Sequence, residues 1–578
     1  MTRYMKDMAP LGLLMVLLSF CAAAAEAPAI TIDGVSDELA DNIRSQLRLA
    51  AEPCETPLPR LLRLLPQARS DAENGLEALG YYHSDIKTDL TREENCWALH
   101  IAVMPGAPIL LDEITIAIQG DQATRDLFGD LVENNILKKG RQLDHGEYEQ
   151  VKNRLSALAV ERGFFAARFL KSEVQVDLVS DLADVVINFD PGQRFRFGLI
   201  SIETGGSLSD RFVRSMVPFA PGDFYSSDDL VALRRNLDRS QYFRQISINP
   251  RLALARQQAI PVEIDLVPYL RRSYTAGLGF TTDTGPRMRL GYIDRYVNQK
   301  GHRFDGNSTL SPVRSELNLN YMLPLENSTT ESLNFSGGVI HEDNDTFNSD
   351  RFKLEGSYRN ESDSGWQRKV FVNFLLDEFN IDVQNEFSQL TVLGADIART
   401  QTDDIINPSR GWKLFAQVRG SSSLLSDVSF MQIYGSAKSV LALGPGRVLS
   451  RLEVGSTWVG DQQELPVSVR FFSGGDQSVR AHDYQTLGPL NENGQVIGGR
   501  HLLVGSVEYD FPVRPDWRLA LFYDAGNAFA NLAEIKVKHT LGLGVRWLTP
   551  IGPIRLDFAQ GLGRTDGFRI HITMGPDL

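Results

Sequence analysis

The second half of the chain alternates apolar and polar residues with a period of two. In residues 317–323, Leu and Tyr alternate with Asn and Met, and residues 541–547, 554–559 and 568–574 follow the same rule. Loops rich in Gly, Asn and Asp separate these segments, and no helical pattern interrupts them after Leu270. The pattern predicts a long succession of antiparallel strands.

These strands continue to the end of the chain, and many of them begin or end at Tyr, Trp or Phe. A soluble β-sandwich would alternate in the same way, but no helices follow that could cover a face of a sheet. The aromatic strand ends favour a transmembrane barrel with an apolar outer surface and a polar lumen. At about 19 residues per strand and connection, the region from residue 270 holds roughly 16 strands.

The N-terminus has the features of a secretory signal. Arg3 and Lys6 precede a short apolar run over residues 11–20, and Ala22 to Ala25 form a small-residue cleavage site. The alternative is that this segment stays attached as an N-terminal anchor helix. Cys21 could be a lipidation site, but such a site normally has a small residue directly before the cysteine, and here that residue is Phe20. Without residues 1–25 the chain has 57 basic and 72 acidic residues, a net charge of −15. This acidic balance does not favour nucleic acid as a partner.

Residues 29–270 repeat themselves with a period of about 80 residues. Each repeat has the pattern of a strand, two helices and two further strands. The second helix ends in turn at Gly80-Tyr81-Tyr82, at Gly163-Phe164-Phe165 and at Gln241-Tyr242-Phe243. A Gly at a helix end lets the chain reverse, and the aromatics are expected to fill the gap between helices and sheet.

The repeats and the Pro-Gly pairs at residues 105–106 and 191–192 suggest domain boundaries. We expect a signal peptide over 1–25, α+β domains over 26–106, 107–192 and 193–269, and the barrel over 270–578. Cys54 and Cys96 are the two cysteines left after signal cleavage. An even pair in an exported protein predicts a disulfide, with two free thiols as the alternative.

One Gly-rich loop between two strands ends in a single arginine. The loop contains Gly474, Gly475, Asp476 and Val479 and leads to Arg480. Two carboxylates lie at lumen positions of later strands, Glu508 between outward Val507 and Tyr509, and Asp524 after outward Tyr523. If the loop folds into the barrel, Arg480 can form forked, charge-assisted hydrogen bonds to Glu508 and Asp524. A solvated loop arginine is the alternative.

The stretch from Gly474 to Arg480, followed by Tyr484 and residues 487–489, resembles the sixth extracellular loop of the BamA-type outer-membrane assembly superfamily. Three further segments agree with this resemblance: residues 407–412, 522–527 and 542–553. The family loop usually reads Val-Arg-Gly and an aromatic residue, whereas this chain has Ala481 and His482. The N-terminal repeats look like polypeptide-transport-associated (POTRA) domains, and the count of three is most similar to the TamA family.

The resemblance implies a bacterial outer-membrane barrel with three periplasmic POTRA domains of β-α-α-β-β order. It also implies that the first and last strands pair weakly and open sideways to take up unfolded outer-membrane protein clients, beside outer-membrane lipid. Gly277, Gly279 and Gly575 fit such a weak seam, or they simply relieve crowding in the lumen. POTRA 1 is expected to bind a TamB-like protein anchored in the inner membrane.

Signatures of enzymes are scarce. The chain contains no G-x-S-x-G, P-loop or H-E-x-x-H motif and no Cys or His grouping with metal spacing, so we expect no enzyme, cofactor or metal. The preferred hypothesis is a factor that inserts β-barrel clients such as autotransporters. A two-partner secretion pore and a phospholipid transporter working with the same partner remain alternatives, and a passive porin would need no repeats.

Overall fold

The computed structural model describes residues 27–93, 96–326, 328–381, 384–461, 464–550, 552–563 and 567–575. The expected signal peptide lies outside these residues. The chain forms two compact units, one of Met1–Arg196 with Phe224–Ser227 and one of Phe197–Asp223 with Asp228–Leu578. No helix in the described ranges is both long and apolar enough to cross a membrane.

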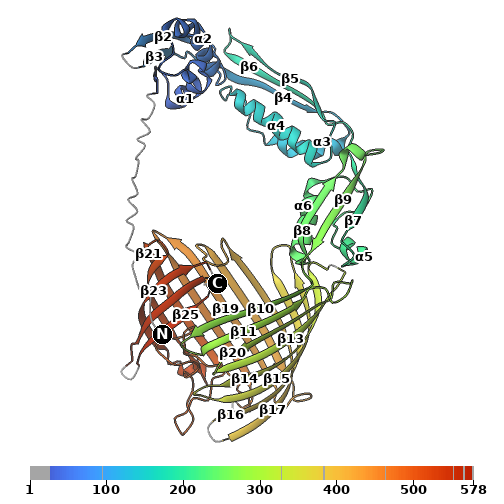
Figure 1. Ribbon diagram of the computed structural model, residues 1–578, viewed down its shortest axis with the longest axis vertical. Coiled ribbons are helices and arrows are strands. Elements are labelled where there is room, and N and C mark those ends of the chain that lie inside the picture. The colour runs from blue at the N-terminus through green and yellow to red at the C-terminus, as the bar shows by residue number, and fades with distance from the viewer. Residues whose placement is uncertain are drawn as a thin grey trace, which may run out of the picture. The chain divides into compact units, whose positions relative to one another are not determined.

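The first unit contains two POTRA-like domains, each with two helices against a three-stranded sheet (Figure 1). In each sheet the last strand lies in the middle, in the orders β1-β3-β2 and β4-β6-β5. The amphipathic helices bury one face against that sheet. The elements are β1 (Ala29–Asp33), α1 (Asp37–Gln46), α2 (Leu58–Glu77), β2 (Asp85–Arg92), β3 (Trp97–Met104), β4 (Leu110–Ile118), α3 (Gln122–Glu133), α4 (His145–Glu161), β5 (Arg168–Asp177) and β6 (Leu182–Asp190).

The first domain contains the disulfide between Cys54 and Cys96, 42 residues apart. The bond ties the loop before α2 to the start of β3. Next to it, the indole N–H of the buried Trp97 donates a hydrogen bond to the carbonyl of Pro53 at 3.0 Å. The two contacts fasten the same loop to the sheet at its covered face.

The third repeat has the same sheet order, β7-β9-β8. Its elements are β7 (Arg196–Glu203), α5 (Asp210–Arg214), α6 (Ser227–Ser240), β8 (Phe243–Pro250) and β9 (Ala259–Pro268). Most of it belongs to the same compact unit as the barrel. In that unit the phenol of Tyr242 donates a hydrogen bond to the carbonyl of Gly301, in the turn after the second barrel strand, at 2.5 Å.

In the first two repeats, the second aromatic residue after the helix contacts the segment that follows its own domain within the first unit. Phe164 lies in the core of its own domain, as the sequence predicts. Its neighbour Phe165 instead packs edge-on against Phe195 and Tyr225, with ring centroids 5.5 Å and 5.0 Å away. The first repeat behaves alike, because the Tyr82 hydroxyl lies 2.8 Å from Nε2 of His145. We expected both aromatic residues after each helix to fill the gap between helices and sheet of their own domain. This was wrong for the second one, Tyr82 or Phe165, which contacts the segment that follows.

The backbone repeats this joint. The amide of Ile109 donates to the carbonyl of Gly80 at 2.8 Å, and the amide of Phe195 donates to the carbonyl of Gly163 at 2.9 Å. Both glycines have positive φ, +82° and +86°. A side chain at Gly163 would also meet Cβ of Tyr225 at 2.9 Å. Gly80 and Gly163 therefore have two roles: each ends its helix with a positive φ, and its carbonyl accepts the hydrogen bond from the following segment.

We expect the first joint to weaken in acid. Burial lowers the pKa of His145 below its usual 6.5, so the neutral ring accepts the Tyr82 hydrogen bond. A group with a depressed folded pKa stabilises the fold above its unfolded pKa and loses that contribution as the pH falls below it. The protection factor of the Ile109 amide, its exchange rate relative to that of an unfolded chain at the same pH, should therefore fall between pH 7.5 and 5.5. In Tyr82→Phe the protection should already be low at pH 7.5, and an unchanged protection factor in both proteins would contradict the idea.

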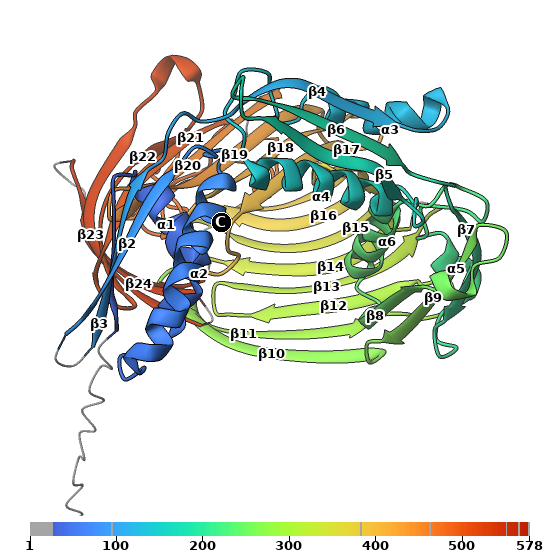
Figure 2. The same ribbon diagram turned by 90° about the horizontal axis from the view of Figure 1, so that it is seen from above.

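The rest of the second unit is one antiparallel sheet of 16 strands that curves round into a barrel (Figure 2). Each strand pairs with its neighbours in the sequence, in the order β10 to β25. The strands are β10 (Arg272–Thr281), β11 (Gly285–Asp294), β12 (Arg303–Leu310), β13 (Arg314–Pro324), β14 (Glu331–Asp343), β15 (Asn348–Glu361), β16 (Gln367–Ile381), β17 (Gln384–Thr402), β18 (Gly411–Ser421), β19 (Phe430–Leu443), β20 (Gly446–Val459), β21 (His501–Arg514), β22 (Trp517–Phe529), β23 (Lys538–Thr549), β24 (Gly552–Gly561) and β25 (Phe568–Met574).

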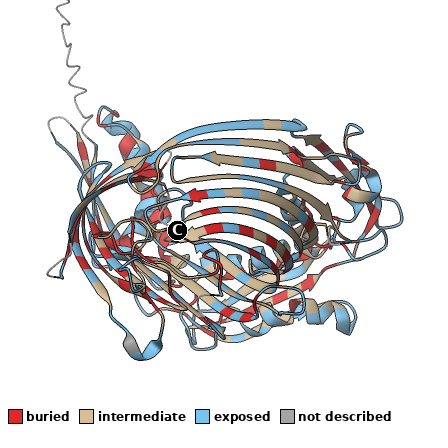
Figure 3. Ribbon diagram, turned by 90° about the horizontal axis from the view of Figure 1, so that it is seen from below, coloured by how far each residue is buried: buried red, intermediate tan, exposed pale blue. Residues whose placement is uncertain are grey.

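Burial alternates along these strands, as Figure 3 shows in bands of colour. On β22, Leu521 and Tyr523 are exposed, whereas Phe522 between them and Asp524 after them are buried. The exposed face is apolar and the buried face is largely polar, the reverse of a soluble sheet and the arrangement of a transmembrane barrel. The predicted fold class, α+β repeats followed by a barrel of about 16 strands, is confirmed.

Candidate functional site

The loop between β20 and β21 folds back into the barrel lumen. Leu465 and Val469 of this loop pack against inward residues of β16 and β17, such as Leu375 and Leu390. Near its tip, Gly474 and Gly475 adopt φ of +101° and +103°. The amide of Gly475 donates to the carbonyl of His482 at 3.0 Å and closes a tight turn. Val479, in this turn, is fully buried.

The turn presents Arg480 to acids of three barrel strands. Nε and Nη2 donate to the two carboxylate oxygens of Asp524 at 2.9 and 2.8 Å, a forked pair. Nη1 lies 2.9 Å from Oε2 of Glu508 and 3.1 Å from Oδ2 of Asp557. The Arg480 side chain is 7% exposed, and Asp524 is fully buried. We refer to Arg480, Glu508, Asp524 and Asp557 as the loop lock.

A second arginine supports the acids from the wall. Nε and Nη2 of Arg546 on β23 donate to Oε1 of Glu508 at 2.9 and 2.7 Å. Its Nη1 donates to Oδ1 of Asp557 at 2.5 Å. Two arginines thus share three carboxylates, so removal of either cation leaves buried negative charge without a partner. Such a loss costs about 3–5 kcal/mol.

Apolar contacts hold the guanidinium in place. Cζ of Arg480 lies 3.3 Å from the centre of the Phe522 ring, a cation–π contact. The Phe522 ring occupies the space that a side chain at Gly542 would fill. Ala481, which stands where the family usually has Gly, is not among the residues with positive φ. It is buried against Phe522 and Ala559, so the small side chain fits a packed position.

The same loop contacts the first hairpin and the last strand of the barrel. The amide of Asp476 donates to Oδ2 of Asp283, in the β10–β11 turn, at 2.5 Å. A Cβ at Gly475 would overlap the same carboxylate. On β25, Nε2 of the buried His571 donates to the carbonyl of Arg480 at 2.5 Å.

His571 also reaches the first hairpin directly. Its Nδ1 lies 3.0 Å from the hydroxyl of Thr282 and 3.5 Å from Oδ1 of Asp283. Among the described residues, no ladder of backbone hydrogen bonds pairs β10 with β25. Side chains of Thr282, Asp283 and His571 therefore bridge the two end strands where the sheet does not. We call this group the seam bridge.

The three glycines expected at the seam lie on or beside these end strands, away from the loop lock. Gly277 and Gly279 are in β10, and Gly575 follows β25 with its amide 3.3 Å from the carbonyl of Pro553. A Cβ at Gly277 or Gly575 would meet no described atom within 4 Å. Relief of crowding therefore does not explain these two glycines, whereas at Gly279 a Cβ would approach the flexible side chain of Arg287.

A second buried ion pair lies near the periplasmic turns. Nε and Nη2 of Arg447 donate to the carboxylate of Asp510 at 3.0 and 2.8 Å, and Nη1 donates to the carbonyl of Pro408 at 2.5 Å. In that turn Asp403 accepts hydrogen bonds from Ser409 and from the amide of Arg410, which lower its pKa to about 2. These contacts explain why residues 407–412 form a motif.

Sequence reasoning placed Arg480 with Glu508 and Asp524, and the structure brings these three together. It missed Asp557, Arg546 and the seam bridge. The alternation of apolar and polar residues along β23, β24 and β25 puts Arg546, Asp557 and His571 at lumen positions. This alternation could have identified them as candidate partners of the loop. Asp283 lies in a turn and has no such signal. The described residues include no group of three or more His, Cys, Asp or Glu side chains that could hold a metal.

The comparisons with known proteins agree with this arrangement. Residues 270–577 match the Omp85 superfamily domain. The chain belongs to the Omp85 superfamily. Residues 29–105 of this Omp85 protein match the POTRA domain described as TamA domain 1. The barrel therefore lies in the bacterial outer membrane, with the POTRA domains in the periplasm.

Similar proteins share parts of this Omp85 chain. The outer membrane protein assembly factor BamA of Nitratidesulfovibrio vulgaris is 23% identical over 431 residues, 70% of this chain and 53% of that protein. The chain thus spans about half the length of this curated relative. The chloroplastic outer envelope protein 80 of Arabidopsis thaliana is 31% identical over 156 residues, 25% of this chain and 20% of that protein.

The fold is also similar to a solved structure. BamA from Haemophilus ducreyi lacking POTRA domains 1–3 has a TM-score of 0.65 and 15% identity, over 81% of this chain and 99% of that chain. At this identity the likeness supports the fold alone. The Omp85 architecture of POTRA domains before a barrel is common to both.

Proposed function

We propose that this protein inserts β-barrel clients such as autotransporters into the outer membrane. A client strand would enter between β10 and β25 and pair with their exposed edges, because unpaired backbone groups at a sheet edge template a further strand. The proposal includes no catalytic step. A TamB-like protein anchored in the inner membrane would bind POTRA 1 and bring clients across the periplasm.

The observation that supports this proposal most is the way the end strands are held. Every other neighbouring pair in the sheet is joined by a backbone ladder, whereas β10 and β25 are joined by the seam bridge within the described residues. A few side-chain contacts can open at far lower cost than a ladder of about ten backbone hydrogen bonds, each worth about 1 kcal/mol net. This is the property that a reversible opening requires.

The proposal is tested with liposomes that contain the purified protein or a general porin. A denatured autotransporter is added, and its folded, protease-resistant form is followed over time. We expect faster folding with this protein than with the porin. Equal rates would overturn the insertase proposal.

The partner is tested separately. A variant without residues 27–106 should keep the fast folding of the client in liposomes but lose binding to a TamB-like periplasmic fragment. If this variant still binds the fragment with the affinity of the full chain, POTRA 1 is not the docking domain.

A further inference from the structure

Three cationic side chains lie in one row on the lumen face of the barrel. Lys413 on β18, Lys438 on β19 and Arg451 on β20 are directly opposite one another. Along β19, Lys438 alternates in step with the buried Gln432, so the row faces the lumen. Like charges directly opposite each other on one face of a sheet repel. The row therefore destabilises the barrel unless negative charge lies close to it.

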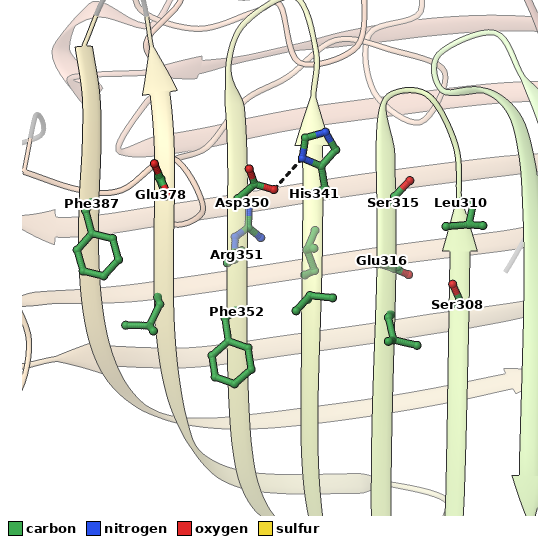
Figure 4. A pocket seen from close by; sticks show the side chains of 14 residues that line it. Ser308, Leu310, Ser315, Glu316, His341, Asp350, Arg351, Phe352, Glu378 and Phe387 are labelled. Carbon is green, nitrogen blue, oxygen red and sulfur yellow. Dashed lines mark hydrogen bonds and ion pairs between the residues drawn. The ribbon is translucent and has the colours of Figure 1, made fainter.

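Two other places in the barrel show how such positions are usually occupied. Figure 4 shows a hollow in the outer wall, where Nδ1 of His341 on β14 lies 2.8 Å from Oδ1 of Asp350, directly opposite on β15. On the lumen face, Nζ of Lys369 on β16 lies 3.0 Å from Oδ2 of Asp396, directly opposite on β17. The row from β18 to β20 contains no such acid.

The cations of the row have few partners in the protein. Lys413 and Lys438 form no hydrogen bond or ion pair with any described residue. Nη2 of Arg451 donates to the carbonyl of Ser478, in the loop between β20 and β21, at 2.8 Å. Its Nε and Nη1 donate to no described residue, and the Nε atom is buried. Ammonium and guanidinium groups without acceptors mark a place that favours an anion from outside the chain.

A polar cavity of about 90 Å³ lies between this wall and the loop. At roughly 15 Å³ for each water, it has room for about six waters or for one tetrahedral oxyanion. Lys438, Arg451, Arg555 and Thr573 of the wall and Gln477 of the loop are among its lining residues. The cavity thus joins two cations of the row to the tip of the loop.

Three carboxylates also border the cavity. Glu508 and Asp557 belong to the loop lock and bond its arginine and the arginine of β23. The carboxyl group of Asp476 shares a hydrogen bond with Asp283 of the β10–β11 turn. None of the three forms an ion pair with Lys438 or with the guanidinium of β20. The acids of the cavity therefore leave the two wall cations open to a further anion.

We propose that this cavity binds one inorganic phosphate ion. One oxygen accepts from Nζ of Lys438, a second from Nη1 of Arg451 and a third from the side-chain amide of Gln477. A guanidinium group suits phosphate oxygens, because its N–H donors point in fixed directions. The phosphate of a lipid does not fit, because a cavity of about 90 Å³ has no space for acyl chains.

Bound phosphate connects the loop with the barrel wall. Gln477 lies in the loop just before Arg480, so an ion held by Gln477 and by the wall stabilises the docked loop. A ligand that binds only the docked form shifts the equilibrium toward that form. The site therefore makes loop docking depend on the phosphate concentration. This inference stands whether or not the protein inserts clients.

The test measures phosphate binding to the full-length protein in detergent by isothermal titration calorimetry, with nitrate at equal ionic strength as the reference ion. We expect wild type to bind one phosphate and to unfold at a higher temperature in phosphate than in nitrate. Lys438→Met removes one charge-assisted hydrogen bond and should weaken phosphate binding about tenfold. In nitrate the same variant should be no less stable than wild type, because it relieves the repulsion within the row.

Lys353→Met is a matched control on β15. It also removes one lysine from the lumen face, and Glu355 keeps its ion pair with Lys369, so phosphate binding should equal that of wild type. Equal unfolding temperatures of wild type in phosphate and nitrate would overturn the site. Unchanged binding by Lys438→Met would overturn its location, and a comparable loss in Lys353→Met would reduce the effect to net charge. Equally tight binding of dihexanoyl phosphatidic acid would contradict a site for free phosphate.

Discussion

Client insertion by Arg480→Ala is expected to fall to the rate of a porin control. The substitution removes four side-chain hydrogen bonds to buried carboxylates. Glu508 and Asp557 keep their hydrogen bonds to Arg546, whereas Asp524 loses its forked pair. A loss of about 3–5 kcal/mol shifts the docking of the loop by about two orders of magnitude or more. The measurement is the folding rate of an autotransporter in liposomes.

Two further variants separate the lock from a general loss of stability. Arg480→Lys keeps the charge but cannot form the forked pair with Asp524, so we expect an intermediate rate. Arg480→Ala/Asp524→Ala removes both partners and should be less harmful than the sum of the single changes. Additive effects, or a wild-type rate for Arg480→Ala, would show that the lock does not govern insertion.

A reversible chemical crosslink between the two end strands of the barrel is expected to stop client insertion until the crosslink is reduced. The side chains of Thr282 and His571 meet at 3.0 Å across the two end strands. In Thr282→Cys/His571→Cys, a short bifunctional thiosulfonate crosslinker should join β10–β11 to β25 and halt client folding. Because the strands can no longer separate, the effect should be nearly complete, and reductant should restore the rate.

The controls for this experiment address the native disulfide and the lost contacts. The wild type with crosslinker and then reductant shows any effect on Cys54 and Cys96. The double variant before crosslinking shows the effect of losing the seam bridge, and we expect it to insert clients no more slowly than wild type. Unimpaired insertion by the crosslinked protein would place the client path elsewhere.

The period-two alternation in the sequence was sufficient to predict the barrel and the inward direction of Glu508 and Asp524. Strand parity depends only on neighbouring residues along the chain, which is why it could be read directly. The contacts of Arg480 with Asp557 and of Arg546 with Glu508 depend on the register between strands and on how deeply the loop descends. Neither the register nor the depth of the loop can be predicted from the alternation of neighbouring residues.

The helical part shows a similar limit. The sequence pattern of residues 38–49 is typical of one helix, but α1 ends at Gln46, because residues 48–51 turn as a 3-10 helix and Arg48 pairs with Asp71 of α2. The sequence pattern predicts a strand over residues 110–118 and a helix over residues 227–240, and both agree with the bounds of β4 and α6. The seam bridge was beyond prediction, since Thr282 and His571 are 289 residues apart and meet only when the barrel closes.

The joint between repeats has a consequence for how this type of chain can change length. The carbonyls of Gly80 and Gly163 accept from the amides of Ile109 and Phe195 in the same way. A recombination that fuses the end of one repeat to the start of the next-but-one would therefore recreate an equivalent joint. Gain or loss of a whole periplasmic domain then needs no new interface, and chains with different numbers of such domains can arise in a single genetic step.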